Sequence, residues 1–212
     1  MASELGFLGR GLLIGLAIAA PVGPMALLCI RRTLERGWPS GFASGLGIAS
    51  ADGIYAAVAA FGLTIVSGLL LREARWVQGV GGLAIVLLGI SSLLRPPPLG
   101  EVAPERRGWG RTGLAGAYAS CLALTLANPP TILSSLAVMA GFGIGTSQGG
   151  ASAAAVVLGV LLGSSAWWAV LTGAIARARG RISPAVRVWI SRLAGLLLVG
   201  LGLAAEIAAF HQ

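Results

Sequence analysis

The stretch "APVGPMALLCIRRTL", residues 20–34, places two prolines three positions apart inside an apolar run of transmembrane length. Proline removes a backbone hydrogen bond and clashes with the preceding helical turn, so Pro21 and Pro24 predict a helix break. In hydrocarbon such a break persists only where protein or a water-filled cavity surrounds it. The prolines lie about 15 to 20 Å into the run, near the bilayer centre. The sequence therefore predicts a half-helix that begins at the membrane midplane.

The composition of the whole chain indicates a polytopic membrane protein. Of 212 residues, 56% are hydrophobic and only 10% are charged, and the mean hydropathy is +0.88. Soluble domains carry about 25% charged residues. Windows of about 20 apolar residues give an all-α protein of six predicted transmembrane helices: Gly11 to Ile30, Gly41 to Leu71, Trp76 to Leu94, Gly113 to Gly145, Ala151 to Ile175 and Val188 to Phe210.

The fifteen basic residues are all arginine, and they lie between the apolar runs rather than along one stripe. This pattern argues against a nucleic-acid partner. Short cytoplasmic loops are rich in Lys and Arg, so a bacterial inner-membrane protein with both termini outside is predicted. Twelve arginines fall on the predicted cytoplasmic side and three on the other: Arg31, Arg32, Arg36, Arg95, Arg106, Arg107, Arg111, Arg177, Arg179, Arg181, Arg187 and Arg192, against Arg10, Arg72 and Arg75. A cleaved signal peptide is the competing interpretation, but no basic segment precedes the first run.

A second proline break is predicted in the fourth run, where "LANPPTIL" spans residues 126–133. Each half of three spans thus opens with a midplane break, and three spans per half give the halves opposite orientations. Paired breaks of this kind point to a transporter's central site, whereas packing kinks are the alternative. We expect one transmembrane domain, residues 1–212, whose halves cover about 1–95 and 112–212. A cytoplasmic Pro/Arg-rich loop, residues 95–111, joins them.

Asp52 is the acidic residue that falls near the membrane centre. An intramembrane acid costs about 2.5 to 3.5 kcal/mol to insert and is a functional-site hypothesis by default. It could carry a proton or pair with a cationic amine, and the alternative is a neutral carboxyl hydrogen-bonded to Ser50 or a neighbouring helix. Half-helix N-termini at Val22 to Met25 and Pro129 to Ile132 suit a carboxylate. Together these features would recognise a zwitterion such as an amino acid.

Small and aromatic residues surround these positions. Small residues let helices approach closely, and they repeat along three runs: Gly11, Gly15 and Ala19; Gly41, Gly45 and Ala49; Gly159 and Gly163. Aromatic side chains often line small-molecule sites, and three follow the small-residue runs: Tyr55, Trp167 and Trp168.

The segment "GLAIAAPVGPMALLCIRRTLERGWPSGFASGLGIASADGIYAAVAAFGL" and the Asn-Pro of the fourth run resemble the LysE/RhtB family of amino-acid exporters. The resemblance implies six inner-membrane helices in inverted halves, dimerisation and export driven by the proton gradient. "NPP" stands where many members have a lysine after Asn-Pro, which weakens inference about the substrate. By this resemblance, the residues that match the family's functional positions are Pro21, Gly23, Pro24, Asp52, Asn128 and Pro129. With the residues argued above, the predicted substrate site comprises Pro21, Val22, Gly23, Pro24, Met25, Asp52, Tyr55, Asn128, Pro129 and Pro130, without a cofactor or metal.

Three other functions are compatible with a helical membrane protein of this composition. A membrane thiol-redox carrier would use Cys29 and Cys121, but Cys29 follows Pro24 by five residues whereas Cys121 precedes Pro129 by eight. We therefore expect the two thiols at different depths. A heavy-metal exporter would need a cluster of soft ligands, which the sequence does not suggest. An enzyme is disfavoured because one central carboxylate without a paired acid offers little for catalysis.

Overall fold

The computed structural model describes residues 2–20, 23–61, 111–127 and 150–210, with isolated positions at 83, 86–87, 90 and 93–94. Within these residues the chain forms helices and no strand. Most of the third predicted span lies outside this part of the chain. So do five of the predicted site residues: Pro21, Val22, Asn128, Pro129 and Pro130. The described helices are α1 (Ala2–Ala19), α2 (Pro24–Arg36), α3 (Trp38–Ala60), α6 (Arg111–Leu126), α8 (Gly150–Ala178) and α9 (Pro184–Phe210).

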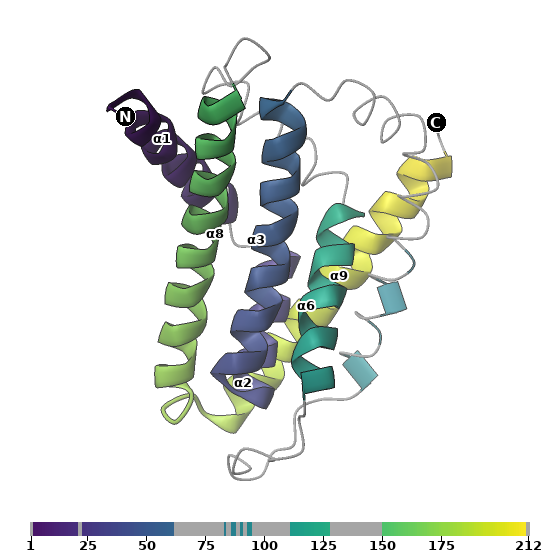
Figure 1. The fold of residues 1–212 in the computed structure, drawn as a ribbon. Coiled ribbons are helices and arrows are strands. Elements are labelled where there is room, and N and C mark those ends of the chain that lie inside the picture. Colours follow the sequence, from purple (N-terminus) through teal and green to yellow (C-terminus); the bar gives the residue numbers. More distant parts are fainter. Residues whose placement is uncertain are drawn as a thin grey trace.

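The helices run up and down through one bundle (Figure 1). The helices α1 and α2 descend in succession, α3 and α6 ascend, α8 descends and α9 ascends. The first turn of α1 and the last turn of α9 therefore lie at the same end of the bundle. Helix α3 is central among the described elements, because it packs against α2, α6 and α8, while α1 packs along α8.

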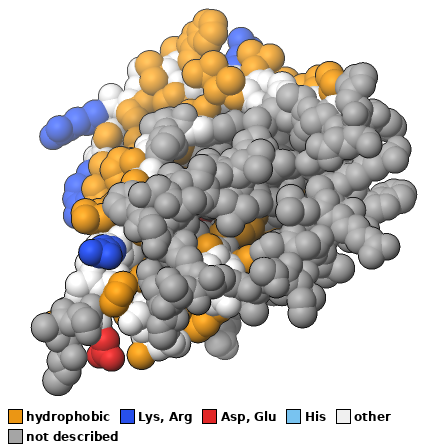
Figure 2. Space-filling view, turned by 90° about the horizontal axis from the view of Figure 1, so that it is seen from above, with side chains coloured by type: hydrophobic (Ala, Val, Ile, Leu, Met, Phe, Trp, Pro, Cys, Tyr) orange, Lys and Arg blue, Asp and Glu red, His pale blue; other side chains and the backbone are white. Residues whose placement is uncertain are grey.

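Two described helices are long and apolar enough to cross a membrane, the 23-residue α3 and the 29-residue α8. Apolar side chains also cover much of the outer surface, including Leu158 and Leu162 on α8 and Leu196 on α9. In the end-on view, hydrophobic side chains predominate in the coloured part of the surface and charged ones are few (Figure 2). In a membrane, lipid tails would cover such a surface. The all-helical prediction is confirmed for the described residues, whereas the inverted repeat stays a prediction.

Glycines allow α1 and α8 to approach until their backbones touch. A Cβ atom added to Gly11 would overlap the carbonyl oxygen of Val156, and one added to Gly15 would overlap that of Val160. The reciprocal contacts come from α8, where Gly159 and Gly163 lie against the backbone of α1. This is the close contact of small faces predicted from the sequence, and it holds α1 against the middle of α8.

Candidate functional site

The first proline segment separates two helices. Helix α1 ends at Ala19, and α2 begins at Pro24 after Gly23, whose backbone is extended at φ −108° and ψ −173°. The residue at the N-cap position is a glycine, so it offers no side chain to cap this start of α2. The first N–H groups of a helix lack partners inside it and carry partial positive charge. The described residues therefore place a helix N-terminus at Gly23 and Pro24, while the proline break itself stays a prediction because Pro21 and Val22 lie outside them.

Asp52 lies on the face of α3 that packs against α8. Its side chain is 1% exposed, and the hydroxyl of Ser164 donates a hydrogen bond of 2.7 Å to Oδ2. The other carboxyl oxygen, Oδ1, has no hydrogen-bond partner among the residues that the structure describes. The alternative considered from the sequence was a hydrogen bond to Ser50 or to a neighbouring helix, and the bond from Ser164 on α8 is of the second kind. Ser50 itself donates to the carbonyl of Leu46 and accepts from Tyr118. One oxygen of a buried acid is thus left able to accept a proton or a cationic donor.

The helix α1 closes this site from a third side. A Cβ atom on Gly15 would lie 2.9 Å from the backbone nitrogen of Ser164, the residue that holds Asp52. Three helices therefore meet around Ser164, whose backbone contacts α1 and whose hydroxyl bonds to Asp52 of α3. The tight packing of α1 on α8 fixes the position of Ser164 and, through it, the orientation of the acid.

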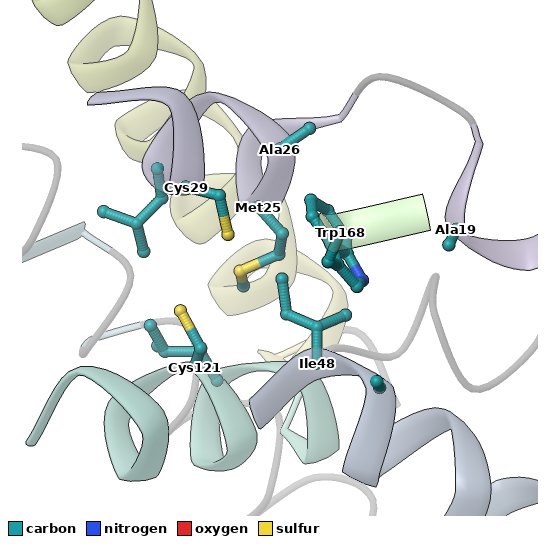
Figure 3. Packing of buried hydrophobic residues seen from close by; sticks show 10 residues of the cluster. Ala19, Met25, Ala26, Cys29, Ile48, Cys121 and Trp168 are labelled. Carbon is teal, nitrogen blue, oxygen red and sulfur yellow. The ribbon is translucent and has the colours of Figure 1, made fainter. Parts of the chain in front are cut away.

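Trp168 supplies an unpaired donor one helical turn from Ser164. Residues four apart share a helix face, so Trp168 lies on the face of α8 that carries the Asp52 partner. Its side chain is 3% exposed, and its indole N–H has no acceptor among the described residues. The ring packs against Gly45 and lies between Ala19 and Met25, at the junction of α1 and α2 (Figure 3). The sequence offered Trp168 only as one of three aromatic candidates.

Tyr55 connects α3 to α6 through its hydroxyl. Its hydroxyl donates to the carbonyl oxygens of Thr125 and Leu126, at 3.0 and 3.1 Å. These are the last residues of α6, immediately before the second proline segment. Tyr55 therefore ties α3 to the end of α6, and its part in a substrate site stays a prediction.

Arg32 is a buried residue whose role the sequence analysis missed, because it was counted among the loop arginines. It is 8% exposed, and its guanidinium joins α2 to α3 and α6 through uncharged groups. Its N–H groups donate to the hydroxyls of Ser44 and Ser120, at 2.8 and 2.9 Å, to the carbonyl of Ala117 at 2.9 Å and to the sulfur of Cys121 at 3.4 Å. The apolar window ends at Ile30, whereas α2 continues to Arg36. Because the helix extends six residues beyond the apolar window, Arg32 lies on α2 inside the bundle and not in a loop.

The expectation that Cys29 and Cys121 lie at different depths is wrong. Both are completely buried and pack in one cluster, to which α2 contributes Cys29 and α6 contributes Cys121. The two sulfur atoms point toward one another, with the sulfur of Met25 beside them (Figure 3). Counting residues from the prolines failed because it ignores how far one helix is shifted along the other. Among the described residues, no three His, Cys, Asp or Glu side chains form a group that could hold a metal ion. The thioether of Met25 packs in the same cluster as the two thiols, which the sequence did not indicate.

Comparisons with known proteins agree on one family. Residues 16–208 match the family model described as LysE type translocator. A relative from Bacillus subtilis (strain 168), "Putative amino acid efflux protein YcgF", is 28% identical over 123 residues. That match covers 58% of this chain and 56% of the relative, so the chain spans little more than half the length of the curated protein it matches. No solved structure matches the chain.

Proposed function

The chain belongs to the family of LysE-type translocators, and from that premise we propose that it exports amino acids or close derivatives across the bacterial inner membrane by proton antiport. Members of this family are membrane transporters and not enzymes, so the chemistry required is binding, release and coupling. The proposal includes two inverted halves that expose a shared site alternately to each side, with both termini outside and dimerisation. The similarity to an amino acid efflux protein supports the choice of substrate class.

The unpaired oxygen of Asp52 is the observation that carries this proposal. A buried carboxyl whose Oδ1 lacks a partner is costly unless a proton or a cation binds there. An amino-acid antiporter handles both ligands, because the proton is its coupling ion and the ammonium group of the substrate is a cation. The hydrogen bond from Ser164 keeps Oδ2 occupied, so Oδ1 is the oxygen that exchanges its ligand during transport.

The carboxylate of an amino-acid substrate would need hydrogen-bond donors, and the protein offers two kinds close to Ser164 and Met25. The N-terminus of α2 has no side-chain cap from Gly23, and its first N–H groups have no partner inside the helix and carry partial positive charge, which suits a carboxylate. The indole N–H of Trp168, one turn from Ser164, is a buried donor without an acceptor among the described residues. An acceptor at Asp52 and donors at Trp168 and α2 would orient an amino acid between α3, α8 and the junction of α1 with α2.

Transport by purified protein in liposomes tests the function. We expect a panel of labelled amino acids to show at least one whose movement out of the vesicle lumen is accelerated by an imposed pH gradient and by the protein. Vesicles without protein are the control. A variant with both Cys29 and Cys121 replaced by serine should keep this activity, which separates export from the thiol-redox function that the meeting of the two thiols favours. If no amino acid moves, or if the double variant loses all activity, the proposal fails.

Replacing Trp168 by phenylalanine tests the carboxylate end of the site. The ring contacts with Gly45 and Met25 would remain, but the indole donor would be lost. A hydrogen bond to a charged group contributes about 1.5 to 3 kcal/mol, so we expect the KM for the transported amino acid to rise roughly tenfold or more. The substrate analogue without its carboxyl group is the matched control, and inhibition by that amine should not change. Equal weakening of both ligands would show that Trp168 acts only in packing.

A further inference from the structure

We propose that Cys29, Cys121 and Met25 form a binding site for a soft monovalent metal cation such as Cu(I), and that Arg32 selects the charge of that cation. Met25 also belongs to the predicted substrate site and packs in the same cluster as Trp168. The metal site uses the sulfur atom of Met25 and does not depend on amino-acid transport. Met25 and Cys29 are four residues apart on α2 and so share one helix face. Cys121 faces them from α6, and the three sulfur atoms point to a common region (Figure 3).

The ligand chemistry of this cluster favours soft cations. Thiolate and thioether sulfur prefer ions such as Cu(I), whereas harder cations prefer oxygen ligands. Apolar side chains of the same cluster, among them Ile48 and Leu124, surround part of the sulfur group, and the guanidinium of Arg32 lies beside Cys121. All three sulfur residues are buried, at 0% exposure for each cysteine and 8% for Met25. Burial of this degree limits the access of water that would compete for the metal.

The charge of Arg32 distinguishes monovalent from divalent ions. Its guanidinium lies 3.4 Å from the sulfur of Cys121, and each acceptor that the described residues offer to it is uncharged. Binding displaces one proton from each thiol, so two thiolates and a monovalent cation carry a net charge of −1, which the guanidinium neutralises. A divalent cation would leave a net charge of +1 in the buried cluster, which is costly.

Metal binding by the purified, reduced protein in detergent tests the proposal, with Ag(I) as a probe that resists redox chemistry. After desalting, we expect one tightly bound Ag(I) per chain together with an ultraviolet sulfur-to-metal absorption band. Cys29→Ser and Cys121→Ser should each abolish both signals, and Met25→Leu should weaken binding. Lack of binding to the wild type, or binding that survives either serine variant, would overturn the site.

Competition between Ag(I) and Zn(II) tests the role of Arg32. The wild type should prefer Ag(I), and Arg32→Gln should shift the ratio of the two affinities toward Zn(II) by on the order of a hundredfold. Arg32→Lys keeps the charge and should keep the preference. Equal affinity of the wild type for the two ions, or a Gln variant with the selectivity of the Lys variant, would contradict the charge selection. If Arg32→Gln does not fold, the ratio of the wild-type affinities for Ag(I) and Zn(II) still tests the proposed charge selection.

Discussion

Replacing Asp52 by asparagine should reduce export driven by a proton gradient to the level of vesicles without protein. The amide has almost the same size and can still accept the hydrogen bond from Ser164, so the packing of α3 on α8 should survive. It can neither ionise nor bind a proton reversibly, and it cannot neutralise an ammonium group. Initial rates of labelled amino-acid efflux under an imposed pH gradient measure the effect. Size-exclusion elution confirms that the variant is folded.

Exchange of labelled for unlabelled substrate, without a gradient, separates the two roles of Asp52. If Asp52→Asn keeps exchange while gradient-driven export is lost, Asp52 carries the proton. If exchange is also lost, it binds the substrate amine. Ser50→Ala is the matched control, because Ser50 lies on the same helix two residues away and bonds to the carbonyl of Leu46 and to Tyr118. Gradient-driven export that persists in the asparagine variant would remove Asp52 from the mechanism.

The sequence was sufficient to predict features that depend on one helix at a time. Apolar runs located α3 and α8, because a helix that crosses a membrane must be long and apolar. Asp52 was recognisable from its position within such a run, and it is indeed buried. The glycine faces were visible in the same way, because their four-residue spacing sets one face of a helix.

Features that depend on two helices could not be predicted. Ser164 lies 112 residues from Asp52, and no local pattern specifies that they meet. The pairing of Cys29 with Cys121 depends on the shift of α2 along α6, which residue counts from the prolines do not give. The apolar run ends at Ile30 and so predicts Arg32 in a loop, whereas α2 continues to Arg36. Long arginine side chains allow α2 to continue inside the bundle, since their polar ends reach acceptors on α3 and α6.

Replacing Gly15 by alanine should destabilise the whole bundle. The added methyl group would overlap the carbonyl of Val160 and crowd the backbone of Ser164, so α1 and α8 would have to separate. Overpacking of this kind costs about 1 to 3 kcal/mol. The midpoint of thermal unfolding in detergent should therefore fall by roughly 5 to 10 °C. Because Ser164 holds Asp52, export should fall as well.

Gly9→Ala is the matched control for this substitution. Gly9 lies on the same helix, and a Cβ atom there would meet nothing within 4 Å. Alanine favours the helix over glycine by about 1 kcal/mol, so the midpoint for Gly9→Ala should stay level or rise. The difference between the two variants isolates the contact between α1 and α8 from helix propensity, since the chemical change is identical. Equal midpoints would mean that the two backbones do not touch in the folded protein, and the position assigned to Ser164 beside Asp52 would lose its support.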